Sequence, residues 1–206
     1  MDEHIYPNEE AYAHQLKTAE NRFAPLPLMD ELKFKAKEAG LWNLFVPEEH
    51  AEYCDHGGLS FFDYAPLAEM MGRVIWCPEV FNCTAPDTGN MEVFMNYATE
   101  AQQREWLDPL LAGDIRSSYA MTEPQVASSD ATNVELRIEK DGNEWILNGH
   151  KWFISNAMYE RTKILIVMGK SDPQNPSRHL QQSQILVPKD TPGVKLVLSL
   201  IHISEP

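Results

Sequence analysis

Two short polar stretches contain the side chains best suited to chemistry. The first, YAMTEPQVASSD at 119–130, places hydroxyls and a carboxylate beside an aromatic residue and a proline. On one interpretation it is a strand end and a capped loop, in which Thr122 and Asp130 hydrogen-bond their own backbone. On the other, a strand presents Thr122 to a planar heteroaromatic ligand. The loop at Ser128 and Ser129 then offers hydroxyl and N–H groups to a phosphate or an amide.

The second stretch is KWFISN at 151–156, and we expect it to form a β-strand. In a strand, Trp152 and Ile154 face one side while Phe153 and Ser155 face the other. An aromatic face beside a hydroxyl suits a flavin, because the ring stacks and a donor can reach its N5 atom. This second stretch therefore favours the ligand-binding interpretation of the first.

Several familiar sequence motifs are absent. The sequence contains neither GxGxxG nor GxxxxGK, the motifs of dinucleotide and phosphate sites, and it has no GxSxG motif of a serine nucleophile. Cys54, Asp55 and His56 follow an acidic segment with His50 and suggest a metal site, but their spacing matches no zinc pattern and favours a polar surface loop. His150 lies in an Asn-Gly turn and is interpreted as a solvated turn residue.

The chain before Gly113 has the pattern of helices. Residues 28–39 carry acids first, lysines later and Gly40 at the end, as a capped helix requires. Ser60 begins a second helix whose dense apolar set should be largely buried, with a kink or a restart at Pro66. Thr99 and Gln102 form a capping box for a third helix that should close between Pro109 and Gly113.

After Gly113 the apolar period shortens to two. Residues 134–138 alternate, turn residues follow at 141–143, and 145–147 return, which predicts a β-hairpin. KILIVMG and SQILVP form further strands on either side of a polar loop from Ser171 to Gln182. The sequence thus predicts an α+β protein, with a helical N-terminal domain at 1–114 followed by a β-domain at 115–198.

Composition limits the classes of partner. The formal net charge of -14 and the pI near 4.8 argue against nucleic acid and anionic membrane surfaces. The apolar runs are too short to span a bilayer, and the three cysteines form no CxxC pair, which suits a reducing compartment. The N-terminus, MDEHIYPNEE, resembles no targeting segment, so we expect a cytoplasmic setting.

The ordered set TEPxxASSD, NGxKWFISNA and VPxxTPGV resembles the acyl-CoA dehydrogenase family over about Leu26 to Leu196. The segments APDTGNMEV and TEPQVASSD are similar to those of its members ten and eleven. The resemblance implies a helical N-terminal domain, an antiparallel, β-barrel-like middle domain and a C-terminal four-helix bundle. This chain supplies the first two, and residues 199–206 match no part of the pattern. Without the bundle, the chain should expose apolar surface and associate.

The resemblance also implies roles for individual residues. Thr122 would bond the pyrimidine end of the flavin of FAD, Phe153 would pack on the ring system, and the Ser155 hydroxyl would lie near N5. The TEPQVASSD loop is one residue longer than usual, so either Ser128 or Ser129 could meet the coenzyme A arm; counting back from Asp130 favours Ser129. The expected FAD contacts are Tyr119, Ala120, Met121, Thr122, Glu123, Ser128, Ser129, Phe153, Ile154 and Ser155.

The family chemistry is α,β-dehydrogenation of an acyl-CoA thioester with hydride transfer to FAD, followed by transfer of electrons to an acceptor such as an electron-transfer flavoprotein. The carboxylate base of the family lies in the bundle, so no catalytic residue is assigned here. The resemblance also implies a homo-oligomer in the full-length form, and a mitochondrial or peroxisomal setting if the chain comes from a longer eukaryotic protein. Alternatives are a flavin-dependent oxidase or monooxygenase, and a non-enzymatic acyl-CoA-binding module.

Two further groups have a functional and a structural interpretation. Arg178 and His179 either contact a coenzyme A phosphate or are solvated in their polar loop. A helical group either lines an acyl pocket or belongs to the core, and the spacing favours the core. Its members are Met91, Phe94, Met95 and Tyr97.

Overall fold

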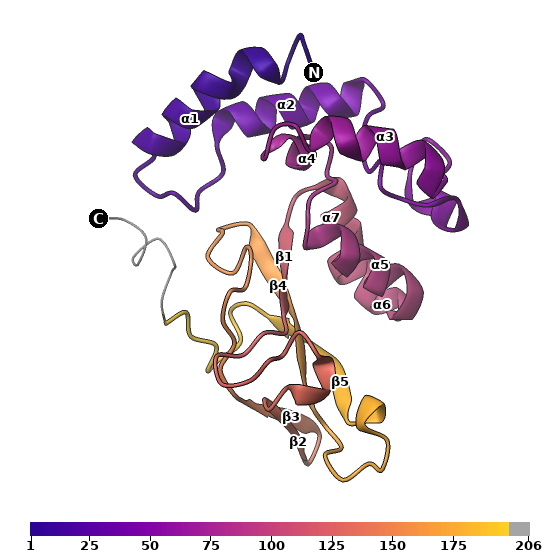
Figure 1. Cartoon of the computed structure of the whole chain (residues 1–206), viewed down its shortest axis with the longest axis vertical. Helices are drawn as coiled ribbons and strands as arrows, with labels where there is room; N and C mark the ends of the chain where they lie inside the picture. The colour runs from indigo at the N-terminus through magenta and orange to yellow at the C-terminus, as the bar shows by residue number, and fades with distance from the viewer. Residues whose placement is uncertain (198–206) are drawn as a thin grey trace. The chain divides into compact units, whose positions relative to one another are not determined.

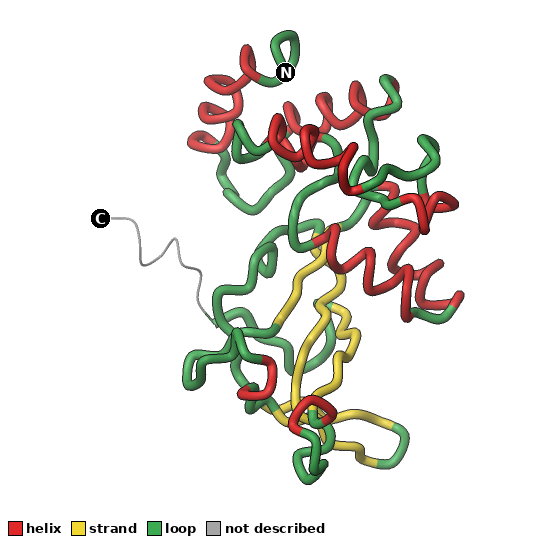
Figure 2. Tube along the Cα trace, turned by 45° about the vertical axis from the view of Figure 1, so that its right-hand side comes forward, coloured by secondary structure: helices red, strands yellow, loops and turns green. Residues whose placement is uncertain are grey.

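A computed structural model describes residues 1–197, and the chain forms two compact units. Unit 1 comprises Met1–Ile115 and Tyr159–Arg161, whereas unit 2 comprises Arg116–Met158 and the chain from Thr162 onward. Helices dominate unit 1 and strands dominate unit 2, as Figure 2 shows in red and yellow. The α+β class is therefore confirmed. The segment 199–206, set aside above, lies outside the described residues.

Unit 1 is built from short helices joined by turns and by longer loops, such as the one between α1 and α2 (Figure 1). The Thr99–Gln102 capping box is confirmed, and Gly113 ends the last helix in the left-handed conformation at φ 75°. Gly40, also left-handed, follows helix α2 as expected. The helices are η1 Tyr6–Asn8, α1 Glu9–Thr18, α2 Pro27–Glu38, η2 Glu48–Tyr53, α3 Phe61–Met71, α4 Cys77–Val80, α5 Asp87–Tyr97, α6 Glu100–Gln102, the π-helix η3 Gln103–Leu107 and α7 Asp108–Ala112.

Helix α3 excludes one of the two alternatives expected at Pro66, the restart, and it is less buried than expected. It runs unbroken through Pro66, and Ser60 caps it by accepting the Asp63 N–H, so the helix does not restart. Its apolar residues are also less buried than expected: Phe61 is 75% exposed and Phe62 is 88% exposed. The helix carries apolar side chains around most of its circumference, and only part of that circumference can face the rest of unit 1.

Burial in unit 1 decides between an acyl pocket and the core for the apolar group on α5. Met91, Phe94 and Met95 are buried and belong to the core, whereas Tyr97 is 85% exposed. They pack in a unit whose other fully buried side chains include Leu32 and Leu107. The structural interpretation is thus confirmed for three of the four residues.

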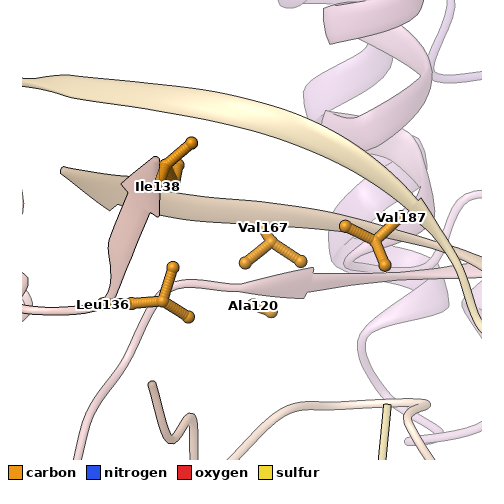
Figure 3. Close-up of a cluster of buried hydrophobic side chains, with 5 residues drawn as sticks. All are labelled: Ala120, Leu136, Ile138, Val167 and Val187. Atoms are coloured by element: carbon orange, nitrogen blue, oxygen red, sulfur yellow. The ribbon is translucent and has the colours of Figure 1, made fainter. Parts of the chain in front are cut away.

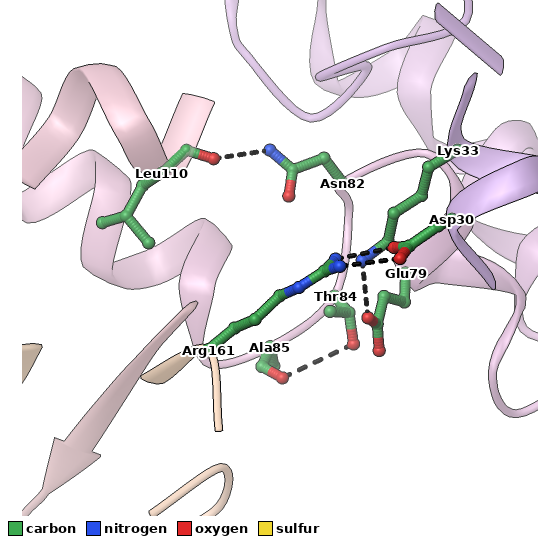
Figure 4. A network of polar contacts seen from close by, with 8 residues as sticks. All are labelled: Asp30, Lys33, Glu79, Asn82, Thr84, Ala85, Leu110 and Arg161. Carbon is green, nitrogen blue, oxygen red and sulfur yellow. Dashed lines mark hydrogen bonds and ion pairs between the residues drawn. The ribbon is translucent and has the colours of Figure 1, made fainter. Parts of the chain in front are cut away.

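Polar contacts fix the loops of unit 1, as the close-up in Figure 4 shows. Arg161 forms two parallel bonds of 2.6 and 2.7 Å to the Asp30 carboxylate, and Lys33 Nζ lies 2.7 Å from Glu79 Oε1. The Asn82 amide donates to the Leu110 carbonyl at 2.9 Å. Two-pronged guanidinium–carboxylate pairs hold orientation as well as charge. The Arg161 pair therefore binds Tyr159–Arg161 to helix α2.

Unit 2 contains one five-stranded sheet in the order β1-β4-β2-β3, with β5 paired to β4. The expected hairpin and both expected flanking strands are confirmed. The expectation of an antiparallel domain is wrong in part, because β1 and β2 both pair parallel to β4. The long segment between β1 and β4 supplies the crossover that a parallel pair requires. The strands are β1 Arg116–Ala120, β2 Arg137–Asp141, β3 Glu144–Asn148, β4 Thr162–Lys170 and β5 Gln182–Pro188, with 3-10 turns η4 Ala131–Asn133 and η5 Arg178–Leu180.

A small apolar cluster lies at the centre of unit 2 (Figure 3). Ala120 ends β1 within this cluster, so the polar stretch that follows β1 starts from a fixed point. Gly169 allows the close packing, because a Cβ there would lie 2.5 Å from a Leu136 methyl carbon. The buried members are Ala120, Leu136, Ile138, Val167 and Val187.

We predict that the exposed aromatic pair on α3 makes the chain associate. Replacing Phe61 and Phe62 by serine should move the chain toward the monomer in sedimentation velocity, because exposed apolar area drives association. The unfolding midpoint should change little, since both rings are exposed. A double Glu9→Ser, Glu10→Ser variant on α1 is the control. A parent chain that stays monomeric at high concentration would contradict the prediction.

Candidate functional site

The two polar stretches of the sequence lie together in unit 2. Trp152 N–H donates to the Thr122 carbonyl at 3.1 Å, and the Thr122 hydroxyl donates in return to the Trp152 carbonyl. Two further bonds continue the join toward β1: Ser118 Oγ donates to the Ser155 carbonyl at 2.8 Å, and Asn156 Nδ2 donates to the Ser117 carbonyl at 3.2 Å. The segment 151–156 therefore runs along β1 and the first residues after it.

The expectation of a strand at 151–156 is wrong. Phe153 has φ 53° and Asn156 has φ 65°, and a backbone in the left-handed region cannot continue a pleat. The alternation of faces is lost as a result. Trp152 and Phe153 are both exposed, at 44% and 59%, with ring centroids 4.5 Å apart. Ile154 turns inward and packs against the apolar cluster of unit 2.

Glu123 is the most constrained residue of the site. It is 4% exposed, and its carboxylate accepts the Glu135 N–H at 2.7 Å, the Leu136 N–H at 2.9 Å and the Lys151 ammonium at 2.7 Å. Lys151 also donates to the Met121 carbonyl at 2.7 Å. This buried pair thus joins the loop after β1, the entry to β2 and the segment 151–156. The role of Lys151 was missed from the sequence, although it directly precedes the aromatic pair.

Burial and pairing act in opposite directions on the charges of this pair. Burial raises the pKa of Glu123, but the bonds from Lys151 and from the two backbone N–H groups outweigh it and lower the pKa overall. For Lys151, burial lowers the pKa more than the Glu123 carboxylate raises it. Glu123 is therefore held as a carboxylate in the folded unit. Its burial and its three accepted bonds give it a structural role.

The structure distinguishes the two serines of the loop. Ser128 is 3% exposed and its hydroxyl accepts the Glu123 N–H at 2.7 Å, whereas Ser129 is exposed. Asp130 caps η4, since its carboxylate accepts both the N–H and the hydroxyl of Thr132, and these bonds lower its pKa. Ser128 thus maintains the shape of the loop, and Ser129 is accessible.

The remaining polar candidates take structural positions. Arg178 donates to the Thr132 hydroxyl at 2.9 Å and to Asn133 Oδ1 at 3.3 Å, so it joins η5 to η4. Tyr119 is half-buried and its hydroxyl accepts a bond from Gln184 at 3.0 Å; burial raises its pKa. His150 is exposed after the hairpin.

Residues 1–197 contain no group of three or more His, Cys, Asp or Glu side chains placed to hold a metal ion. Within the same range, no helix combines the length and the apolar character needed to cross a bilayer.

Comparisons with known proteins identify the family. Residues 1–114 match the acyl-CoA dehydrogenase N-terminal domain, and residues 118–199 match the acyl-CoA dehydrogenase middle domain. The chain belongs to the acyl-CoA dehydrogenase family.

Several relatives are similar over nearly the whole chain. It is 48% identical to acyl-CoA dehydrogenase family member 10 of Mus musculus over 100% of this chain, and 50% identical to family member 11 of Gallus gallus over 97%. It is also 50% identical to FadE2 of Mycobacterium tuberculosis over 97% of this chain. The chain spans 19%, 25% and 47% of these three relatives, respectively.

Solved structures share the fold. A protein of Mycobacterium abscessus, described as an acyl-CoA dehydrogenase, is 47% identical with a TM-score of 0.85, over 93% of this chain and 48% of that chain. A glutaryl-CoA dehydrogenase of Mycobacterium smegmatis in complex with FADH2 is 21% identical with a TM-score of 0.56, over 93% of this chain and 43% of that chain. The second likeness shows the fold alone.

We predict that acid weakens unit 2 through Glu123. Its pKa in the folded unit lies below the ordinary 4.5, so below pH 4.5 the unfolded chain takes up a proton before the folded one does. The free energy of unfolding should therefore fall as the pH is lowered through this window. Urea unfolding at a series of pH values measures it. Glu123→Gln should flatten the dependence, whereas Glu139→Gln, at an exposed ion pair on β2, should not.

We also predict different effects for the two serines. Ser128→Ala should lower the free energy of unfolding by about 1–3 kcal/mol, because it leaves a buried N–H without its acceptor. Ser129→Ala should change it by less than about 0.5 kcal/mol, as is usual at exposed positions. Urea unfolding of both variants at neutral pH tests this. Equal losses in the two would contradict the division of roles.

Proposed function

We propose that this chain is the FAD- and acyl-CoA-binding portion of an acyl-CoA dehydrogenase, an oxidoreductase acting on CH–CH groups. The observation that carries the proposal is the paired bonding of Thr122 and Trp152, which brings the two candidate segments together in one unit. Family membership supports the same conclusion independently. The closest competing class is a flavin-dependent oxidase or monooxygenase on the same scaffold.

The side chains of this region fit a flavin. A flavin needs an apolar stacking surface next to hydrogen-bonding groups, and Trp152 and Phe153 leave aromatic surface exposed beside two hydroxyl residues, Thr122 and Ser155. Buried aromatic rings at these positions would have argued against such a ligand. Their exposure instead leaves apolar area whose burial under a planar ring would be favourable.

The ten proposed FAD contacts divide into two kinds. Thr122, Phe153 and Ser155 are accessible and are proposed to contact the ring system with their side chains. The partly buried Tyr119 and Met121 and the exposed Ser129 complete the accessible group. Side chains buried within unit 2 can contribute only through their backbone or by fixing the loop. These are Ala120, Glu123 and Ser128, with the partly buried Ile154.

Ser129 is proposed to meet the coenzyme A arm. It is the exposed serine of the loop, while the hydroxyl of Ser128 is already bonded to the Glu123 N–H. A hydroxyl can both donate to and accept from the amide groups of such an arm. This assignment agrees with the count back from Asp130.

The chemistry proposed for the whole protein is α,β-dehydrogenation of an acyl-CoA thioester, in which bound FAD accepts the hydride. This chain would bind and orient the ring and the thioester, and would exclude water from one side of the site. Glu123 is not proposed as the base for the α-proton, since its carboxylate is buried and already accepts three hydrogen bonds. We place the base in the part of the protein beyond this chain, which spans less than half of its named relatives.

The partners proposed for the whole protein follow from the same family. They are an acyl-CoA substrate, an electron acceptor such as an electron-transfer flavoprotein, and further copies of the chain in a homo-oligomer. A role in fatty acid β-oxidation is part of this proposal. The cytoplasmic setting remains a prediction from the sequence.

We predict that Phe153 is needed for flavin binding. A titration of the purified chain with FAD, followed by flavin fluorescence, should give roughly tenfold weaker binding for Phe153→Ala, because stacking on an aromatic ring is worth about 1–3 kcal/mol. Trp145→Ala is the matched control, since Trp145 is similarly exposed, at 51%, but lies on hairpin strand β3.

Three outcomes would contradict the proposed function. Equal losses in Phe153→Ala and Trp145→Ala would mean that the flavin does not bind where the two segments meet. Binding of an acyl-CoA without any binding of FAD, by the chain extended to the length of its relatives, would favour the non-enzymatic module. A product that requires oxygen in place of a protein acceptor would favour the oxidase.

A further inference from the structure

The three cysteines of unit 1 lie in very different surroundings. Cys77 and Cys83 are buried, and burial raises the pKa of each thiol to about 11. Thiols of this kind are inert, because the thiolate is the nucleophilic form. Cys54 is only half-buried, and it lies in the loop between η2 and α3.

Cys54 has an imidazole as its neighbour. Its sulfur lies 3.7 Å from Nδ1 of His56, within hydrogen-bonding range for sulfur, and at the same distance from the Ala51 carbonyl oxygen. The Ala51 carbonyl only accepts a hydrogen bond from the thiol, whereas the imidazole nitrogen is basic and can take up the thiol proton. A nucleophile and a base at this separation, with the base held by a third group, is the arrangement that activates a thiol.

The third group is the backbone carbonyl of Asn43. His56 Nε2 lies 3.1 Å from this oxygen, which can only accept, so the ring proton is on Nε2 and Nδ1 is directed at the sulfur as an acceptor. Asn43 is itself fixed: it is 5% exposed, its side chain donates to the Leu111 carbonyl at 3.1 Å, and Asn82 donates to its side-chain oxygen at 2.7 Å. The imidazole is thus held in one tautomer and one orientation.

A backbone donor completes the surroundings of the sulfur. Gly58 N–H donates to Cys54 Sγ at 3.1 Å, a bond that strengthens when the sulfur becomes negative. The loop can approach this closely only with glycine, because a Cβ at position 58 would lie 2.6 Å from the Glu48 Cα atom. Four exposed acids lie on η2 and next to Cys54 in the loop, so a positively charged reagent is favoured over an anionic one. They are Glu48, Glu49, Glu52 and Asp55.

We propose that Cys54 and His56 form a thiol–disulfide exchange site for small, positively charged disulfides. His56 Nδ1 takes the proton from the thiol, and the Cys54 sulfur attacks one sulfur of the disulfide. The S–S bond of the reagent breaks as the bond to Cys54 forms, and the leaving thiolate takes up the proton from His56. One small thiol is released for each mixed disulfide formed, so no other oxidant is required.

Cystamine, a dicationic disulfide, is the probe. The purified native chain is mixed with cystamine, and mixed disulfides are located by intact mass and peptide mapping. We expect one adduct, at Cys54, formed at least about tenfold faster than by the same chain in urea, where the neighbours of the sulfur are lost. Glutathione disulfide, which is anionic, should react more slowly than cystamine with the native chain.

Matched variants test the role of the imidazole. His56→Asn should slow the native reaction by about tenfold, since positioned general bases contribute at least this much. His14→Asn, on helix α1, should leave the rate unchanged. An adduct at Cys77 or Cys83, or an unchanged rate in a folded His56→Asn variant, would overturn the proposal. If that variant does not fold, the parent chain still decides, because equal Cys54 rates in the native and urea-unfolded chains would overturn it.

Discussion

The candidate flavin site depends on one buried ion pair. Glu123 and Lys151 are both secluded from solvent, and between them they bond the loop after β1, the entry to β2 and the segment 151–156. A buried carboxylate is costly unless it is paired and hydrogen-bonded, and an ammonium and two backbone N–H groups bond to its two oxygens. Removing either partner would leave the other as an unpaired buried charge. The positions of Thr122 and Phe153 follow from this pair, because Thr122 directly precedes Glu123 and Phe153 lies two residues after Lys151.

In the loop after β1, buried residues that hold the shape of the loop alternate with exposed residues that a ligand can reach. Glu123 and Ser128 turn inward and bond each other through a backbone N–H, while Ser129 and Asp130 are exposed. Such a loop can present hydroxyls to a ligand without paying the full entropy of ordering them at binding, since its shape is already fixed. A similar arrangement occurs in the segment 151–156, where Ile154 is partly buried against the core and the neighbouring Phe153 is exposed.

Two asparagines form a buried polar network in unit 1, in addition to its ion pairs. Asn43 and Asn82 both have a positive φ, at 56° and 55°, and their side chains bond each other and the carbonyls that end α7. Asparagine tolerates this backbone region because its short polar side chain can bond nearby groups. The result is a fixed carbonyl at Asn43, on which the orientation of His56 depends. Buried polar networks of this kind are stable only when every member is satisfied.

The sequence alone determined the elements whose causes are local. The capping groups at Ser60 and Thr99, the glycine ends at Gly40 and Gly113 and the hairpin around Gly142 depend on neighbouring residues, so they could be predicted. It also indicated the two polar stretches, 119–130 and 151–156, that form the candidate site. Tertiary structure decided the parallel pairing of β1 with β4, the left-handed turn at Phe153, the exposure of Phe61 and the pairing of Glu123 with Lys151. Each of these depends on segments distant in the chain, and pattern in a short window contains no information on which distant partner will satisfy a buried charge or cover an apolar face.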